Sequence, residues 1–263
     1  MNIRKLLITL ISANLFLSLS GCAPTTSQDP NAPAALRVGV SGDNAPLIYK
    51  AGGRDFAGAE ADFAKMLGQE LGREVKFVSM PFDRLLPAVQ RGEVDIVMSG
   101  LTVIAQRKTL VDFTDPYMNS GQAILVPTAS GTLFDDPRLI FISPYRIGVE
   151  EASVGSLLAQ RTHQNSVTVP YSTPTKAANA LAKGKVDIVI HDAPVLWRIT
   201  ADNPSAPYKV VPNLISRESL AWAVRRGDTN LRKQANAALA KWRKNGTLDG
   251  ILRTHMPRYD MIQ

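Results

Sequence analysis

Cysteine is almost absent from this chain, because Cys22 is its only one. A single cysteine cannot form an internal disulfide, so the fold does not depend on a disulfide framework. Histidine is also scarce, and the three that occur lack the spacing of metal ligands. There is no Gly-x-Ser-x-Gly turn and no glycine-rich phosphate-binding loop. These absences argue against metalloenzymes, serine hydrolases and nucleotide-binding enzymes, and they predict that no metal or other cofactor is needed.

Long apolar runs are missing as well. The apolar segment at residues 6–19 follows Arg4 and Lys5, and it is shorter than the roughly 20 residues that a comfortable membrane span needs. A charged start followed by a short apolar segment is typical of a secretory signal peptide. We assign this signal to residues 1–21 and expect it to be cleaved.

The next residue offers an explanation for the lone cysteine. Leu19-Ser20-Gly21-Cys22 resembles the lipobox of bacterial lipoproteins, in which the cysteine is acylated and becomes the new N-terminus. The resemblance implies a lipid anchor at Cys22, a flexible tether over residues 22–35, and a place in the periplasm or at the cell exterior, attached to a bacterial membrane. The alternative is a signal peptide that ends by chance near a buried or free cysteine.

The excess of basic residues is moderate. The formal net charge of +7 falls to +5 when the signal peptide takes Arg4 and Lys5 with it. Basic segments such as residues 225–226 and 241–244 belong to no recognised nucleic-acid-binding motif. They predict solvated surfaces, which can face acidic lipid head groups, and no nucleic-acid partner.

A short repeat divides the chain into two halves. Residues 37–40 (RVGV) recur as residues 146–149 (RIGV), and residues 92–97 (GEVDIV) recur as residues 184–189 (GKVDIV). Each copy of the second motif follows an amphipathic helical pattern, and each half predicts strand, helix, strand, helix, strand. The chain therefore predicts two similar α/β lobes.

Further patterns complete the predicted elements. The spacing of Phe63, Met66, Leu67 and Leu71 is that of a buried helix face. The predicted elements between and after the repeats are a helix at 56–71, a strand at 75–80, a helix at 82–91, a strand at 94–98, a helix at 174–183, a strand at 186–190, a strand at 220–224, a helix at 231–244 and a short helix around 251–252.

The segment after the second repeat needs a partner to pack against. The simplest packing returns it to the first lobe, which gives lobe 1 residues 36–121 and 218–263 and gives lobe 2 residues 122–217. The chain then crosses between lobes twice, and two crossings make a hinge.

Small and polar residues follow the predicted strands of both halves. In open α/β sheets, ligands bind beyond the carboxyl ends of the strands. That rule selects residues that we expect to face each other across a cleft, namely Ser41 to Asn44, Ser99 to Thr102, Ala152 with Ser153, and His191 with Asp192.

Arg107 and Asp192 suit a zwitterion. An arginine can give a desolvated carboxylate two parallel hydrogen bonds, and an ionised aspartate can accept from an ammonium group. Each residue also has a simpler explanation. Arg107 could be a surface arginine beside Lys108, and Asp192 could be the N-cap of a helix that begins at Ala193-Pro194.

Three motifs resemble those of the family 3 extracellular solute-binding proteins, the amino-acid receptors of bacterial ABC importers. They are residues 58–63 (GAEADF), residues 100–107 (GLTVIAQR) and residues 112–117 (DFTDPY), and the likeness extends over residues 36–257. It implies an α/β, two-lobed periplasmic-binding-protein fold of type II, with a ligand cleft between lobes joined by two hinge crossings. It also implies a monomer that captures an amino acid or similar small zwitterion by closing its lobes, and delivers it to an ABC permease in the membrane.

The resemblance also implies roles for single residues. Gly100 and Thr102 would bond the ligand through backbone and hydroxyl groups, Arg107 would clamp its carboxylate, and Asp192 would hold its ammonium group with His191 alongside. Together with the loop residues selected above, the predicted ligand-binding set is Ser41, Asn44, Gly100, Thr102, Arg107, Ser153, His191 and Asp192.

The sequence departs from the family pattern in both halves. Asn44 stands where the family usually has an aromatic residue that stacks on the ligand. Glu150 and Glu151 stand where Lys or Gln is common, and Ala152 stands where Gly is common. An acidic second lobe could favour a cationic or polar ligand, or Glu150 could be solvated.

Two other functions are compatible with the same scaffold. The resemblance extends to periplasmic cyclohexadienyl dehydratases, which would need an acid of perturbed pKa in the cleft, such as Glu150, Glu151 or Asp192. A ligand-sensing module is the other alternative, and it would need a separate signalling partner.

Overall fold

The computed structural model describes residues 33–53, 55–134, 144–162 and 165–262. The predicted signal peptide, Cys22 and the tether up to residue 32 lie outside these residues, as does His163. Ala34 and Ala35, at the end of the predicted tether, accept hydrogen bonds from Arg73 at 2.7 and 3.0 Å. Within the described ranges, no helix is long and apolar enough to cross a membrane.

The first sheet belongs to lobe 1. It holds, in spatial order, β5 (Val75–Ser79), β1 (Leu36–Val40), β6 (Ile96–Val97), β15 (Ala223–Arg225) and β7 (Val111–Phe113). β5, β1 and β6 run parallel, and β15 is antiparallel to both of its neighbours. Leu36, Val38 and Val40 of β1 point to one face of the sheet and are fully buried, while Gly39 points to the other face, where Val94 and Leu85 cover it.

The second sheet belongs to lobe 2 and repeats this plan. It holds, in spatial order, β11 (Val167–Tyr171), β10 (Arg146–Glu150), β12 (Ile188–Asp192), β9 (Gln122–Pro127) and β13 (Tyr208–Val210). β11, β10 and β12 run parallel, and β9 is antiparallel to both β12 and β13. The sequence repeat therefore corresponds to a repeat of sheet topology.

Helices and short turns surround the two sheets. Those of lobe 1 are α1 (Ala59–Leu71), η1 (Phe82–Arg84), α2 (Leu85–Arg91), α3 (Ala105–Lys108), α8 (Thr229–Lys244), α9 (Thr247–His255) and η3 (Tyr259–Ile262). Those of lobe 2 are η2 (Thr128–Ser130), α5 (Val154–Thr162), α6 (Pro174–Ala182) and α7 (Ala193–Asp202). A small sheet of β2 (Asp43–Asn44), β3 (Ile48–Gly52) and β4 (Asp55–Ala57) precedes α1.

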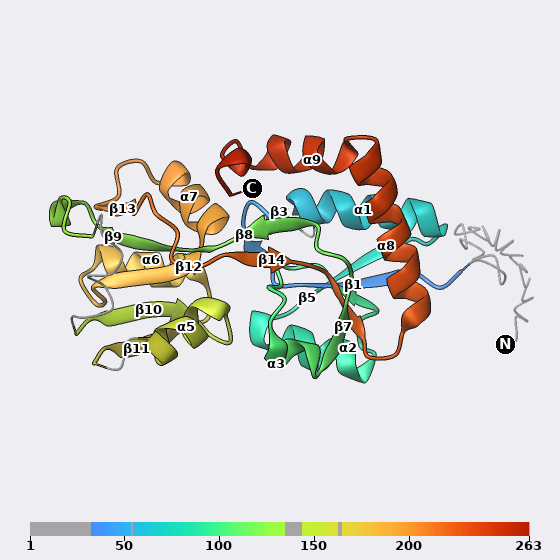
Figure 1. Ribbon diagram of the computed structural model, residues 1–263, viewed down its shortest axis with the longest axis horizontal. Helices are drawn as coiled ribbons and strands as arrows, with labels where there is room; N and C mark the ends of the chain where they lie inside the picture. The colour runs from blue at the N-terminus through green and yellow to red at the C-terminus, as the bar shows by residue number, and fades with distance from the viewer. Residues whose placement is uncertain (1–32, 54, 135–143, 163–164, 263) are drawn as a thin grey trace, which may run out of the picture. The chain divides into compact units, whose positions relative to one another are not determined.

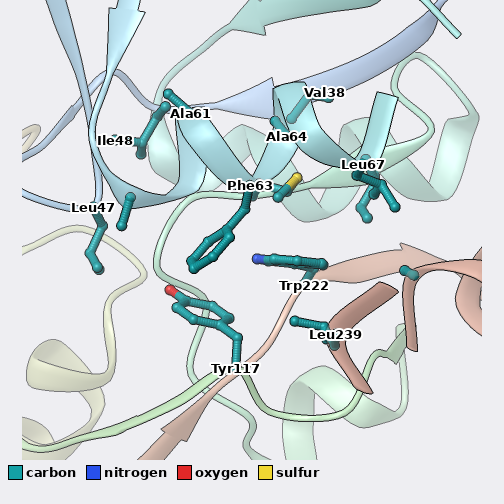
Figure 2. Packing of buried hydrophobic residues seen from close by; sticks show 14 of the residues in the cluster. Val38, Leu47, Ile48, Ala61, Phe63, Ala64, Leu67, Tyr117, Trp222 and Leu239 are labelled. Carbon is teal, nitrogen blue, oxygen red and sulfur yellow. The ribbon is translucent and has the colours of Figure 1, made fainter. Parts of the chain in front are cut away.

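The core of lobe 1 is aromatic. Phe63 of α1 lies 5.9 Å from Tyr117, 5.8 Å from Trp222 and 5.8 Å from Trp242, measured between ring centroids. Figure 2 shows the rings of Phe63, Tyr117 and Trp222 facing one another, with Leu239 of α8 beside them. Trp222, Leu239 and Trp242 all belong to the C-terminal segment, so this segment packs into the same aromatic core as Phe63 of α1.

The two crossings between lobes lie side by side. The chain leaves lobe 1 after β8 (Met118–Ser120) and returns through β14 (Glu218–Leu220), and these strands pair antiparallel (Figure 1). A Cβ atom at Gly121 would lie 2.3 Å from the carbonyl oxygen of Ser216, so the crossings meet at backbone contact. This close pairing is the structural basis of a hinge.

Several predicted elements need correction. The helix predicted from residue 56 begins at Ala59, because Gly58 has a φ of +113° and the residues before it form β4. The predicted strand at 220–224 is split between β14 and β15, and the helix at 82–91 begins as the 3₁₀ turn η1. The strand predicted at 186–190 is β12, which starts at Ile188 and ends with Asp192.

Candidate functional site

The loop of residues 99–102, which we call the Gly100 loop, is fixed by several partners. Ser99 Oγ lies 2.9 Å from Ser41 Oγ and accepts from Ser41 N at 3.0 Å. Gly100 N donates to Glu60 Oε2 at 2.7 Å, and Thr102 Oγ1 donates to Glu218 Oε2 at 3.1 Å. The Gly100 amide is therefore already bonded, and within this residue only the carbonyl oxygen remains for a solute.

Glu60, which accepts this bond, is fully buried. Burial raises its pKa to about 8, although the bond from Gly100 acts in the opposite direction. The pKa of the Tyr117 phenol is raised, mainly by burial and in addition by the charge of nearby Glu60. Glu60 is therefore mostly protonated at neutral pH.

Arg107 is buried, with 5% of its surface exposed, so the explanation of a surface arginine is wrong. It lies in α3, where Nη1 donates to Thr102 O at 3.1 Å and Nη2 donates to Ala152 O at 3.0 Å. Since Ala152 follows β10, the second bond joins the two lobes. Burial lowers the pKa of Arg107, and carboxylates from both lobes, chief among them Asp192, partly offset this.

Ala152 has the unusual backbone conformation that permits this contact. Its φ is +58°, in the left-handed region that favours glycine. This explains why a glycine is common at this position in the family that the sequence resembles. The alanine keeps the carbonyl within reach of Arg107 at some cost in backbone strain.

His191 and Glu150 form a buried pair in lobe 2. His191 Nε2 lies 3.0 Å from Glu150 Oε2, and the two residues are 3% and 5% exposed. Burial lowers the pKa of His191, but the hydrogen bond and charge of Glu150 outweigh burial, and the net pKa is raised. The alternative of a solvated Glu150 is therefore wrong, whereas Glu151 is exposed.

Asp192 ends β12 and occupies the N-cap position of α7. Its side chain makes no capping bond; instead, Oδ1 accepts from Gln122 Nε2 at 2.5 Å. Burial raises the pKa of Asp192 to about 6, and the charge of His191 opposes this. The carboxylate is thus directed at the interior, and the capping explanation does not hold for it.

These side chains enclose a small cavity between the lobes. Its volume is only about 10 Å³, which is close to the space of a single water molecule, so the lobes are closed on it. The lining residues are Asn44, Phe82, Gly100, Thr102, Arg107, Gln122, Glu150, Ser153, Val154, His191 and Asp192.

The structure brings most of the predicted set to this cavity. Ser41 is the exception, because it lines a neighbouring groove and reaches the site only through its bonds to Ser99. Ser153 lines the cavity, but its hydroxyl already accepts from Ser156 N at 3.1 Å. Asn44 donates to Ser99 O at 3.3 Å.

Sequence reasoning missed residues that lie outside the loops it selected. Glu60 was part of a recognised motif, but the motif alone gave it no role. Phe82 lies in the turn before α2, 5.5 Å from Arg107 when measured from ring centroid to guanidinium carbon. Gln122 and Glu218 lie at the two hinge crossings and are bonded at 3.2 Å. No spacing in the sequence marked these last residues.

Two similar α/β lobes closed on a buried polar cavity define a solute-binding protein of the two-lobed kind. The family model of the bacterial extracellular solute-binding proteins, family 3, matches residues 36–258. The chain belongs to this family.

Individual relatives are similar over nearly the whole chain. A probable histidine-binding protein of Neisseria gonorrhoeae is 28% identical, and the match covers 95% of each chain. A putative ABC transporter arginine-binding protein 2 of Escherichia coli is 27% identical and covers 94% of this chain and 97% of its own. Among solved structures, an ancestral arginine-binding protein bound to arginine has a TM-score of 0.79 at 31% identity, covering 85% of this chain and 99% of its own.

Proposed function

We propose that this protein captures an amino acid between its lobes and delivers it to the permease of an ABC importer. The observation that supports this most directly is the position of Arg107, a buried guanidinium of lobe 1 that contacts lobe 2 at Ala152. A solute carboxylate bound by the Arg107 guanidinium would be held where the two lobes meet. Asp192, across the cavity, would accept from the ammonium group.

The charges around the cavity favour a cationic amino acid. Glu150, Asp192 and Glu218 come from different strands, and each acts on the pKa of Arg107 through its negative charge. Among the lining residues, Arg107 and His191 oppose Glu150 and Asp192, and Glu218, which bonds the lining residues Thr102 and Gln122, adds a third carboxylate. An amino acid with a positive side chain would restore the balance, in keeping with relatives described as histidine- and arginine-binding proteins.

The roles of two loop residues follow from their existing bonds. Because Gly100 N is held by Glu60, we assign to Gly100 a carbonyl contact with the solute's ammonium group rather than an amide contact with its carboxylate. The hydroxyl of Thr102 donates to Glu218, so while that bond is kept it can accept from the solute's ammonium group but cannot donate to its carboxylate.

The remaining predictions concern the N-terminal segment, the oligomeric state and the lobe boundaries, and they stay proposals. We propose that Cys22 is acylated, that residues 22–35 tether the lobes to a bacterial membrane, and that the protein acts outside the cytoplasm as a monomer. The lobe boundaries after residues 121 and 217 belong to the same proposal. If Cys22→Ala protein remains membrane-bound after signal cleavage, the lipid anchor is not what holds it.

A thermal-shift screen tests the proposed function. The chain from residue 23 onward would be melted with each of the twenty amino acids, polyamines, small peptides and prephenate. A ligand at 100 times its Kd stabilises the fold by about 2.7 kcal/mol, and we expect this with arginine, histidine or lysine. A shift with prephenate alone, followed by its consumption, would instead identify a dehydratase, although the relatives named above are described as binding proteins.

A further inference from the structure

The peptide unit between Ser99 and Gly100 is held at both of its polar atoms. Its carbonyl oxygen accepts from Asn44 Nδ2 at 3.3 Å, and its N–H donates to Glu60 Oε2 at 2.7 Å. A Cβ atom on Gly100 would lie 2.4 Å from Asn44 Nδ2, and φ at Gly100 is +66°, so a side chain does not fit there. This unit therefore has one orientation, and it leads directly into the cavity-lining residues of the Gly100 loop.

Glu60 itself is rigidly placed. Its N–H donates to Leu47 O at 2.8 Å, in the first turn of α1. A Cβ atom on Gly58, just before the helix, would lie 2.3 Å from the same carbonyl, so the start of α1 packs tightly on the backbone of the preceding segment. The Glu60 carboxyl is thus presented to the Gly100 loop from a fixed helix end.

The second oxygen of Glu60 has a different environment. Within the described part of the chain, neither Glu60 Oε1 nor the Tyr117 hydroxyl meets the geometry of a hydrogen bond, although the hydroxyl is near enough to lower the pKa of Glu60 as a donor would. The titratable groups that act on Glu60 are Tyr117, on the segment packed beneath it, and Asp192, across the cavity. Burial of a carboxyl is costly unless the group is hydrogen-bonded, and the bond that Glu60 accepts is the one from Gly100 N.

We propose that Glu60 is a positioning residue for solute binding, whose carboxyl oxygen holds the Ser99–Gly100 peptide unit in the orientation that the cavity requires. This inference rests on the proposed function, because it concerns the same cavity. Glu60 is not among the residues lining that cavity, so it acts through Gly100. Without an acceptor, the Gly100 amide would be buried and unpaired, and the loop would turn to find another partner.

Two substitutions at this position separate the acceptor from the bulk of the side chain. Glu60→Gln keeps an oxygen for the Gly100 amide and has nearly the shape of a protonated glutamate. Glu60→Leu keeps the volume and removes the acceptor. Glu70→Gln is the matched control, since Glu70 lies on the same helix and bonds the exposed Lys241 at 2.7 Å.

Calorimetric titration with the amino acid found in the screen measures the effect. Wild type and Glu70→Gln should bind alike, Glu60→Gln should lose less than threefold, and Glu60→Leu should lose tenfold or more. Equal affinity in Glu60→Leu and wild type would overturn the proposal, as would an equal loss in both Glu60 variants. Absence of binding in wild type would instead overturn the proposed function, so the two failures are distinct.

An amide spectrum keeps the inference testable even if Glu60→Leu fails to fold. In wild type, the Gly100 amide resonance should move with pH as Glu60 loses its proton, with a midpoint near the pKa of about 8. In Glu60→Gln it should not move over the same range, because the amide side chain does not titrate. A Gly100 resonance that is insensitive to pH in wild type would show that Glu60 does not control this peptide unit.

Discussion

The two lobes share an arginine–aspartate pair at one end of their sheets and differ in the residues at the other end. In lobe 1, Arg37 N and Nη2 donate to Asp95 at 2.9 and 2.5 Å; in lobe 2, Arg146 N and Nη2 donate to Asp187 at 2.7 and 2.6 Å. These are the arginines and aspartates of the two repeated motifs. In each lobe, this arginine–aspartate pair joins one central strand to the residue just before the neighbouring strand: β1 to the start of β6 in lobe 1, and β10 to the start of β12 in lobe 2.

The glycine and valine of the repeat have a matching explanation. A Cβ atom on Gly39 would lie 3.1 Å from Val94, and one on Gly148 would lie 3.2 Å from Val186. In each lobe, the valine before the aspartate packs over the glycine of the first strand. What the lobes share is thus scaffold, in keeping with close packing of the sheet on both faces.

The opposite ends of the sheets carry the differences. Lobe 1 contributes the guanidinium Arg107 and the Gly100 loop with its buried Glu60, whereas lobe 2 contributes the carboxylates Glu150 and Asp192 with His191. The site is therefore asymmetric although the scaffold is repeated. Sequence similarity between the halves therefore marks scaffold residues and not the residues that line the cavity.

The largest effect should come from Arg107→Ala, which removes the cation from the lobe 1 side. Truncating one partner of a buried, hydrogen-bonded charge pair costs about 2–5 kcal/mol, so amino-acid affinity should fall at least 30-fold by calorimetric titration. Lys108→Ala, on the same short helix, is the control and should change affinity little. Unchanged affinity in Arg107→Ala would refute the assignment of the carboxylate to this residue.

The Arg37–Asp95 and Arg146–Asp187 pairs allow a direct comparison of how much each contributes to the free energy of unfolding. Burial raises the pKa of Asp95, but the bonds and charge of Arg37, with the charge of Arg73, outweigh it and lower the pKa overall. The Asp95 side chain is 18% exposed and that of Asp187 is 35% exposed. Asp95→Asn should therefore cost about 1–3 kcal/mol and Asp187→Asn less than about 1 kcal/mol in urea unfolding.

The pH dependence of this pair of variants sharpens the test. A lowered carboxyl pKa stabilises the fold above the unfolded pKa, and the benefit is lost as pH falls through the folded pKa. The gap between wild type and Asp95→Asn should accordingly close in acid. Equal costs for the two aspartates at neutral pH would mean that the extra arginine in lobe 1 adds nothing.

The His191–Glu150 pair should be visible by titration. Glu150→Gln removes the main group that raises the His191 pKa, so the imidazole midpoint measured by NMR should fall. Since the pKa of folded wild type is raised, the pair stabilises the fold below the unfolded pKa and loses this effect as pH rises through the folded value. An unchanged midpoint would mean that other charges in the cavity hold the proton.

The smallest effects should come from two serines, Ser41 and Ser153, which follow corresponding strands of the two lobes. Ser41 bonds across to Ser99, whereas Ser153 accepts from Ser156 in its own helix. Ser41→Ala should weaken solute binding a few-fold with little change in stability. Ser153→Ala should lower stability by about 0.5–2 kcal/mol, as loss of a helix cap does. The reverse pattern would exchange their roles.

Much of the scaffold was predictable because its signals are local or repeated. The RVGV and RIGV strands followed from the repeat and the helix face around Phe63 from periodicity, whereas the return of the C-terminal segment was predicted as the simplest packing. Boundaries were weaker where a glycine or short turn decided them, as at Gly58 and around η1. Residues 218–225 form two strands because β14 pairs with β8 and β15 pairs with β7, and both partners lie far from these residues in the sequence.

The family, the two-lobed plan and the loops at the strand ends could be predicted from the chain alone, since each shows in a short motif or in the repeat of one. Which atoms are free to bind depended on the folded structure. Burial turned Arg107 from a surface candidate into an interlobe contact, paired Glu150 with His191, and placed Glu60 against an amide 40 residues away. The physical reason is that desolvation and hydrogen bonding are set by neighbours in space, and no local pattern records them.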